Sequence, residues 1–497
     1  MLFNSIQFLC FFPVVILLYF LIPHRFRYFF LLVASYYFYM CWNPKYALLM
    51  ALSTIITYLS GLVLGTVSVS KMLPRRVSLR KWIVFISFFL NLFILFFFKY
   101  FNFVSGNISN LLSFVGVSVQ QPRFDVVLPV GISFYTFQAL SYTIDVYRGD
   151  IPPERNLLKY ALFVSFFPQL VAGPIERSKN LLYQISEVHH FQWQRVKSGL
   201  LLMAFGYFQK VVIADRLAIL VNQIYNHYPF YEGFEIALAT ACFAFQIYCD
   251  FASYSNIAIG AARIMGFRLM ENFNTPYFSA SVTEFWRRWH ISLSTWFRDY
   301  LYIPLGGNRK GMLRKYINIM AVFLVSGLWH GASWHFVVWG GLNGLYQIVE
   351  SVTKPLRDKI AEALHIDRSQ FSHRLLSGVY TFLLVDFAWL FFRADGFITG
   401  LNMLHRMFLT FNPWIFFDGT LYTFGLDQKD FTVLWVSALI MLVFSVCKYR
   451  GISLEKALAK QGLWFRWFVY FAVIFFILIF GVYGPSTDES AFIYFQF

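Results

Sequence analysis

A histidine lies in the middle of a strongly apolar stretch, residues 326–336, which reads S-G-L-W-H-G-A-S-W-H-F. An ionisable group at membrane depth is costly, so it normally faces the protein interior or a water-filled cavity. His330 could be a neutral structural histidine, a metal ligand or a general base, a role that suits histidine because its pKa lies near neutrality. The metal interpretation is the weakest, because the nearby His335 would lie about 140° further round a helix.

Tryptophans flank this histidine on both sides. Trp329, Trp334 and Trp339 would form a dry aromatic wall around a reacting group, although tryptophans at such spacing also serve ordinary packing. The stretch therefore offers either a shielded site for proton transfer or a packed core.

The element that carries His330 is expected to be broken. Residues 316–349 form an apolar run that would be roughly 50 Å long as one helix, too long for one perpendicular crossing. Basic residues flank both of its ends, which favours a cytoplasmic position for both. Two half-length helices that meet near Gly327 and Gly331 satisfy length and charge together, and one long, strongly tilted helix is the alternative.

A second stretch, residues 271–309, is too charged to span a membrane and too apolar for an ordinary loop. This mixture predicts an interfacial or re-entrant helix pair. Arginine binds phosphate through two parallel hydrogen bonds and stacks on flat rings. A site for an anionic ligand could therefore use Trp286, Arg287, Arg288 and Trp289, and a lipid-headgroup anchor with internal salt bridges is the alternative.

Three further polar residues carry weaker signals. His290 lies two residues after Arg288, at the edge of the charged segment, where a lone histidine is usually structural. Asn308 closes the turn P-L-G-G-N, which by itself is too weak a signal for a phosphate-binding loop. Asp250 follows Gln246 by four residues, so both lie on one helix face within an apolar run. Asp250 could orient a catalytic histidine or bridge two helices.

The composition defines the setting of these residues. Of the 497 residues, 58% are hydrophobic and 13% are charged, and hydrophobic runs of about 18 or more residues recur along the chain. We expect an all-α, multi-pass membrane protein with about eleven to thirteen transmembrane or re-entrant helices. Residues 1–497 would form one membrane domain, with N-terminal helices (1–125), a motif-bearing core (126–350) and C-terminal helices (351–497).

The net charge of +16 is concentrated in short loops between apolar runs. This distribution indicates orientation by the positive-inside rule and contact with anionic lipids rather than nucleic-acid binding. The basic residues 71–81 and 448–466 are expected in the cytoplasm, so that the chain ends outside with F-I-Y-F-Q-F. Five scattered cysteines form neither a disulfide framework nor a zinc pattern, and nucleotide-binding and protease motifs are absent.

Four separated stretches carry a further signal. They are L-P-V-G-I-S-F-Y-T-F-Q from Leu128, F-P-Q-L-V-A-G-P-I-E-R from Phe167, E-F-W-R-R-W-H-I-S-L-S-T-W-F-R-D-Y-L-Y-I-P-L-G-G-N-R from Glu284 and G-L-W-H-G-A from Gly327. In this order they resemble the membrane-bound O-acyltransferases (MBOAT), and within them the alginate O-acetylation branch. The resemblance covers essentially the whole chain. It implies an MBOAT core in the bacterial inner membrane and acyl transfer from a cytoplasmic donor, acetyl-CoA in this branch, to an acceptor on the outer face.

The resemblance also implies roles for individual residues. His330 falls on the family's intramembrane catalytic histidine, and His290 falls on its second recurrent polar position. The terminal F-I-Y-F-Q-F is similar to an F-x-Y-x-x-F pattern that is proposed as an acyl relay in related systems, here through Tyr494. Tyr494 would present the acyl group to an extracytoplasmic partner, typically an SGNH-type acetyltransferase that modifies the polysaccharide. A hydrophobic tail packed on the helix bundle is the alternative.

We therefore expect three catalytic residues, His330, His290 and Tyr494. The substrate and donor site is expected to draw on Trp286, Arg287, Arg288, Trp289, Asp250, Asn308 and Trp329. We expect no metal and no bound cofactor, with acetyl-CoA as a substrate.

The chain departs from the branch in one motif. Members commonly have D-F-S-G-Y-S-D where residues 250–256 read D-F-A-S-Y-S-N, so Ser253 and Asn256 loosen the assignment to alginate itself. Acceptors in this branch include alginate, cellulose-like polymers and peptidoglycan. Two alternatives belong to other classes: D-alanyl transfer to teichoic acid from a carrier protein, and a non-enzymatic transporter or export scaffold.

Overall fold

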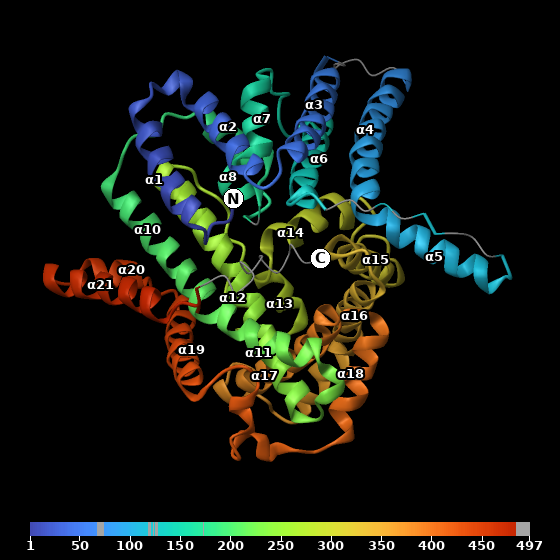
Figure 1. Cartoon of the computed structure of the whole chain (residues 1–497). Helices are drawn as coiled ribbons and strands as arrows, with labels where there is room; N and C mark the ends of the chain where they lie inside the picture. The colour runs from blue at the N-terminus through green and yellow to red at the C-terminus, as the bar shows by residue number, and fades with distance from the viewer. Residues whose placement is uncertain (67–73, 118–120, 123, 125–127, 172, 484–497) are drawn as a thin grey trace. The chain divides into compact units, whose positions relative to one another are not determined.

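The computed structural model describes the chain except for residues 67–73, 118–120, 123, 125–127, 172 and 484–497 (Figure 1). The described residues form helices and loops, with no strand among them. The predicted all-α class is therefore confirmed. Tyr494 and the rest of the terminal F-I-Y-F-Q-F lie outside the described residues.

Eight helical runs in the described ranges are long and apolar enough to cross a membrane. They are α3 (Pro44–Thr66), the run Ser78–Phe114 through α4 and α5, the run Trp193–Asn226 through α10 and α11, α12 (Phe234–Met265), α15 (Met312–His330), α17 (Phe371–Arg393), α19 (Gln428–Tyr449) and α21 (Leu463–Phe480). The protein is thus a multi-pass membrane protein. The predicted eleven to thirteen segments also include shorter apolar helices such as α1 (Ile6–Leu21).

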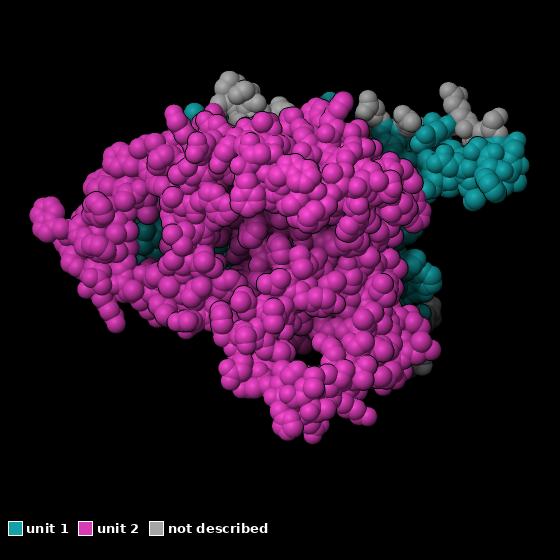
Figure 2. Space-filling view, turned by 90° about the horizontal axis from the view of Figure 1, so that it is seen from below, with its two compact units in different colours: residues 1–203, 255–270 teal, residues 204–254, 271–497 magenta. Residues whose placement is uncertain are grey.

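The described chain divides into two compact units, drawn in teal and magenta in Figure 2. Unit 1 comprises residues 1–203 and 255–270, and unit 2 comprises residues 204–254 and 271–497. Every described residue that was predicted from the sequence to belong to the site lies in unit 2. The predicted division at residues 125 and 350 follows motifs along the sequence and stays a prediction.

Unit 1 is built around helix α6. Helices α3 and α4 both pack against α6, and α2 packs against α7. Besides α1, α3 and residues 255–265 of α12, its elements are α2 (His24–Met40), α4 (Pro74–Leu95), the π-helix η1 (Phe96–Tyr100), α5 (Phe101–Phe114), α6 (Ile132–Arg148), α7 (Leu157–Ser165), α8 (Phe167–Leu170), α9 (Ser178–Ser186) and most of α10 (Trp193–Tyr207).

A buried carboxylate fixes the loop between α8 and α9 in unit 1. Glu176 accepts hydrogen bonds from Asn180 Nδ2 at 2.6 Å and from the backbone N–H of Met270 at 2.5 Å. Burial raises the pKa of Glu176 to about 7. Glu176, near the end of the stretch that begins at Phe167, therefore links this stretch to the segment that follows α12 through its hydrogen bond with Met270.

Unit 2 combines long helices with short helical turns. Its remaining elements are the π-helix η2 (Phe208–Ala214), α11 (Asp215–Asn226), η3 (Tyr228–Phe230), η4 (Pro276–Phe278), α13 (Val282–Arg288), α14 (Ile291–Phe297), the π-helix η5 (Arg298–Tyr302), α16 (Trp334–Ala363), α18 (Phe397–Leu409), η6 (Pro413–Phe416), η7 (Thr420–Thr423) and α20 (Leu454–Ala459). Helices α13 and α14 form the helix pair that the charged and apolar residues 271–309 predicted.

Helices α15 and α16 form a hairpin around the predicted break. Helix α15 ends at His330, α16 begins at Trp334, and the two helices pack along each other. The alternative of one long, tilted helix is therefore wrong. The expected half length is also wrong, because α15 has 19 residues and α16 has 30. The basic residues near 354 mark the end of the apolar run, and α16 continues beyond it through Pro355.

Glycines allow the two helices of this hairpin to approach closely. A Cβ on Gly340 would lie 2.3 Å from the carbonyl oxygen of Phe323, and a Cβ on Gly327 would lie 2.3 Å from the carbonyl oxygen of Phe336. Small residues at such crossings bring the backbones of membrane helices together. The glycine seam therefore fixes the turn that carries His330.

A methyl group at Gly340 should test this seam. Gly340→Ala is expected to lower the free energy of unfolding by about 1–3 kcal/mol, because the added Cβ overpacks the crossing. Thermal unfolding in detergent measures the effect. Gly341→Ala is the matched control, since its Cβ would meet only Leu324 Cδ2 at 3.7 Å. A Gly340→Ala protein as stable as Gly341→Ala would contradict the role of the seam.

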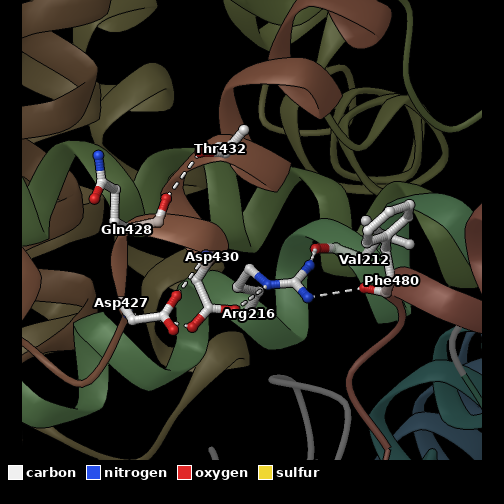
Figure 3. A network of polar contacts seen from close by, with 7 residues as sticks. All are labelled: Val212, Arg216, Asp427, Gln428, Asp430, Thr432 and Phe480. Carbon is white, nitrogen blue, oxygen red and sulfur yellow. Dashed lines mark hydrogen bonds and ion pairs between the residues drawn. The ribbon is translucent and has the colours of Figure 1, made fainter.

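Arg216 hydrogen-bonds to both of the last two long helices in unit 2 (Figure 3). Arg216 on α11 donates from Nε to Asp430 Oδ1 at 3.1 Å, from Nη1 to the Val212 carbonyl at 2.8 Å and from Nη2 to the Phe480 carbonyl at 2.9 Å. Asp430 belongs to the capping box that begins α19, and Phe480 ends α21. The chain therefore leaves α21 at the point where α19 begins. The extracytoplasmic position of this end stays a prediction.

Candidate active site

His330 is the last residue of α15, and its ring lies in an aromatic enclosure. Its exposed fraction is 3%. The ring centroid of His330 lies 4.9 Å from that of Trp329, 4.9 Å from that of Trp339 on α16 and 5.4 Å from that of Phe392 on α17. Three separate helices therefore supply the walls. Such a site excludes bulk water from the imidazole.

The aromatic wall extends outward from Trp339 through more tryptophans. Trp339 stacks on Trp389 at 5.6 Å and meets Trp286 at 5.6 Å, while Trp289 packs on Trp389 at 5.2 Å. Trp286 and Trp289 are both buried. This geometry is that of packing, and donor binding by these two residues stays a prediction. The expected third wall residue, Trp334, is 54% exposed, so its inclusion in the wall was wrong.

His290 lies between α13 and α14 in an unusual backbone conformation. Its φ is +41°, a left-handed value that non-glycine residues adopt only where surrounding contacts hold them. The ring is fully buried, 4.6 Å from the ring of Phe251 and 6.1 Å from that of Trp329. Burial lowers the pKa of His290 to about 3, so the ring is neutral at pH 7.

The two histidines share one neighbour. The ring centroid of Trp329 lies 6.1 Å from that of His290 and 4.9 Å from that of His330. The fold thus brings together the two residues that the sequence nominated most strongly. Both imidazoles are buried beside the same indole, where bulk water is excluded.

The two arginines beside His290 have different surroundings. Arg288 binds Glu284 at 2.8 Å and donates to the carbonyl of Asn274 at 3.3 Å and to Thr275 Oγ1 at 3.2 Å. The ion pair between Arg288 and Glu284 is an internal salt bridge of the kind expected for a lipid-headgroup anchor. Arg287 is exposed, so of the two it is the side chain that an anionic ligand can reach. Donor binding by either residue stays a prediction.

Asn308 lies far from His330. It is exposed in the loop before α15, and Asn318 Nδ2 holds this loop by donating to the Gly307 carbonyl at 2.9 Å. The 19 residues of α15 separate the loop from His330, which corresponds to roughly 28 Å of helix. Asn308 and His330 are therefore not brought together.

Asp250 takes part in a buried ion cluster. Lys210 Nζ lies 2.7 Å from Asp250 Oδ1 and 2.8 Å from Asp215 Oδ1, and all three side chains are buried. Asp250 on α12 thereby bridges to the π-helix η2, as in the helix-bridging alternative. Its expected part in substrate binding stays a prediction. Sequence reasoning missed Lys210 and Asp215, although a lysine inside an apolar run is a detectable signal.

Asn272 is a second residue that sequence reasoning missed. Its side-chain oxygen lies 3.0 Å from His290 Nδ1 and accepts from Ser292 Oγ at 2.9 Å. Its carbonyl accepts the N–H of Ile291 at 2.9 Å. An asparagine near a turn is too common a pattern to reveal this contact. The other nearby histidine, His335, donates from Nδ1 to the Phe391 carbonyl at 3.0 Å, which is a structural bond between α16 and α17.

Comparison with known proteins adds a second line of information. The family described as "MBOAT, membrane-bound O-acyltransferase family" matches residues 153–392, which include His290 and His330. The chain is 38% identical over 450 residues to a probable alginate O-acetylase of Azotobacter vinelandii, covering 90% of this chain and 85% of that protein.

Two more relatives extend this similarity. A probable alginate O-acetylase of Pseudomonas aeruginosa is 38% identical over 455 residues, covering 91% of this chain and 82% of that protein. A peptidoglycan O-acetyltransferase of Helicobacter pylori is 32% identical over 406 residues, covering 76% of this chain and 73% of that protein. The similarity therefore includes proteins named for two different acceptors.

Proposed function

This chain belongs to the membrane-bound O-acyltransferase family, and we propose that it passes an acetyl group from cytoplasmic acetyl-CoA across the membrane for O-acetylation of an extracytoplasmic polysaccharide. The observation that carries the proposal is the water-excluded enclosure in which His330 and His290 share Trp329. The names of the relatives support a glycan acceptor, since alginate and peptidoglycan are both hydroxyl-bearing glycans.

The proposed chemistry is attack of a hydroxyl on the thioester carbonyl. A C–O bond forms and the C–S bond of the thioester breaks. His330 takes the hydroxyl proton as attack occurs and returns it to the leaving thiolate, which departs as the thiol of CoA. The aromatic walls keep out water, which would otherwise hydrolyse the thioester.

The donor and the partner follow from the same proposal. Arg287 is exposed one turn or less from His290, and its guanidinium suits a phosphate of the CoA nucleotide. The setting would be the bacterial inner membrane, with lipids around the apolar helices. An extracytoplasmic SGNH-type acetyltransferase would take the acetyl group from Tyr494 and place it on the polysaccharide.

Transfer of label from radiolabelled acetyl-CoA to the purified chain tests this proposal. The parent protein is expected to become labelled and to release CoA, and Tyr494→Phe is expected to lose the label because no hydroxyl remains to carry it. Tyr483→Phe is the matched control in the same C-terminal segment; its hydroxyl only donates to the Ile477 carbonyl. Equal labelling of Tyr494→Phe and parent would exclude the relay. Absence of both label and CoA release in the parent would exclude acetyl-CoA as donor.

A further inference from the structure

Asn272 is the residue on which the geometry of His290 depends. Its exposed fraction is 1%, and that of His290 is 0%. The side-chain oxygen of Asn272 faces His290 Nδ1 at 3.0 Å, Ser292 Oγ at 2.9 Å and the backbone nitrogen of Ser292 at 3.3 Å. The Asn272 carbonyl also accepts from Ile291. Asn272 therefore hydrogen-bonds to the backbone N–H groups of Ile291 and Ser292, which follow His290, and also to the His290 ring.

These contacts determine which ring nitrogen of His290 carries the proton. The backbone N–H of Ser292 can only donate, so the Asn272 atom that faces it must be the oxygen and not the amide nitrogen. That oxygen can only accept, and His290 Nδ1 must therefore donate to it. In a neutral imidazole the second nitrogen then carries the lone pair. His290 Nε2 is an acceptor.

The groups packed around His290 do not disturb this assignment. Ser292 Oγ also lies 3.4 Å from His290 Nδ1, but its hydrogen is donated to Asn272 Oδ1 at the shorter distance of 2.9 Å, so Nδ1 remains the donor to Asn272. Aromatic rings of Phe251, Phe273 and Trp329 face the imidazole from α12, from the loop before η4 and from α15. The closest charged side chain in the sequence, Arg288, is engaged by Glu284 and Asn274. Asp250, next to Phe251, is bonded to Lys210.

We propose that Asn272 is a positioning residue that makes His290 the binding group for the hydroxyl of the acyl acceptor. An acceptor nitrogen at Nε2 can bind the O–H that reacts, whereas the thioester group that reacts with it offers only acceptors. His290 therefore belongs to the acceptor side of the site. The inference rests on the proposed function and adds no covalent step: the bound hydroxyl rotates its hydrogen to His330 when its oxygen attacks.

Variants at Asn272 separate this role from a merely structural one. Asn272→Ala removes the acceptor, and it is expected to slow acetyl transfer by at least about tenfold while acetyl-CoA binding, measured with radiolabelled ligand, stays at the parent value. Asn272→Asp keeps an acceptor for the same donors. Its charge raises the pKa of His290, so the acid limb of the pH–rate profile should move up by about one unit or more, with transfer near the parent rate at alkaline pH.

Thr295, on the helix that follows His290, supplies the control for the Asn272 variants. Thr295→Ala on α14 is the matched control, since Thr295 Oγ1 donates only to carbonyls of its own helix; it should transfer like the parent. The inference is overturned if Asn272→Ala weakens acetyl-CoA binding as much as it slows transfer, or if Asn272→Asp follows the parent at every pH.

A readout without substrate keeps the inference independent of the proposed function. Solid-state NMR of isotope-labelled histidine reports the tautomer of each ring, and the His290 signal is identified by its loss in His290→Gln. We expect a non-protonated Nε2 in the parent and in Thr295→Ala, and a mixture of tautomers in Asn272→Ala. A protonated Nε2 in the neutral ring of the parent would overturn the assignment. A parent that shows the expected tautomer but no transfer would count against the proposed donor alone.

Discussion

Replacing His330 with alanine is expected to lower acyl transfer by at least about 100-fold, the usual contribution of a general base. The imidazole lies at the turn of the α15 and α16 hairpin, inside walls formed by Trp329, Trp339 and Phe392. Water does not replace a deleted base in such a dry enclosure. CoA release from acetyl-CoA by the purified protein measures the loss.

A neighbouring histidine provides the control for this variant. His335 is also buried, but its Nδ1 is bonded to the Phe391 carbonyl, so His335→Gln is expected to keep most of the activity. Thermal unfolding checks that both variants remain folded. Parent-like CoA release by His330→Ala, or an equal loss in both variants, would remove His330 from the role of base.

The break at His330 could be predicted because length and charge are properties of the sequence alone. An apolar run too long for one crossing, with basic residues at both ends, allows few arrangements. The glycines that the break needed were also visible at Gly327 and Gly331. The residue at which α16 ends could not be predicted, because a helix can continue into water beyond its apolar run.

The exposed position of Trp334 shows a limit of a different kind. Five residues separate Trp334 from Trp339, so on one helix the two side chains point about 140° apart. The same spacing had argued against His330 and His335 as a metal pair. Applied to the tryptophans, it would have placed only one of the two in the wall, as the structure does.

The partners of the site could not be predicted, for a geometric reason. Asn272 meets His290 only because a left-handed residue between α13 and α14 turns the chain back toward the segment after α12. Lys210 and Asp215 are five residues apart, a spacing that faces one side only where the helix widens into the π-helix η2. Neither a turn of this kind nor a π-helix has a dependable signature in one sequence.

The buried ion cluster on η2 leads to the second large effect, on stability. One lysine and two aspartates carry a net charge of −1, and Lys210 is 2% exposed. Lys210→Met removes the cation that lies 2.8 Å from the buried Asp215 and 2.7 Å from the buried Asp250. Removal of one partner from a buried ion pair costs about 3–5 kcal/mol. We expect Lys210→Met to lower the free energy of unfolding by this amount, as measured by denaturant or thermal unfolding in detergent.

The charge count also predicts an order among the variants. Asp250→Asn leaves Lys210 and Asp215 as a neutral pair, so it should destabilise the protein much less than Lys210→Met. Lys354→Met is the control for loss of a lysine ion pair at the surface, because the side chains of Lys354 and its partner Asp358 are 69% and 38% exposed; such pairs contribute about 0–1 kcal/mol. If Lys210→Met were as stable as Lys354→Met, the cluster would not hold η2 against α12. If Asp250→Asn were the more destabilising change, contacts of Asp250 other than that with Lys210 would stabilise the fold.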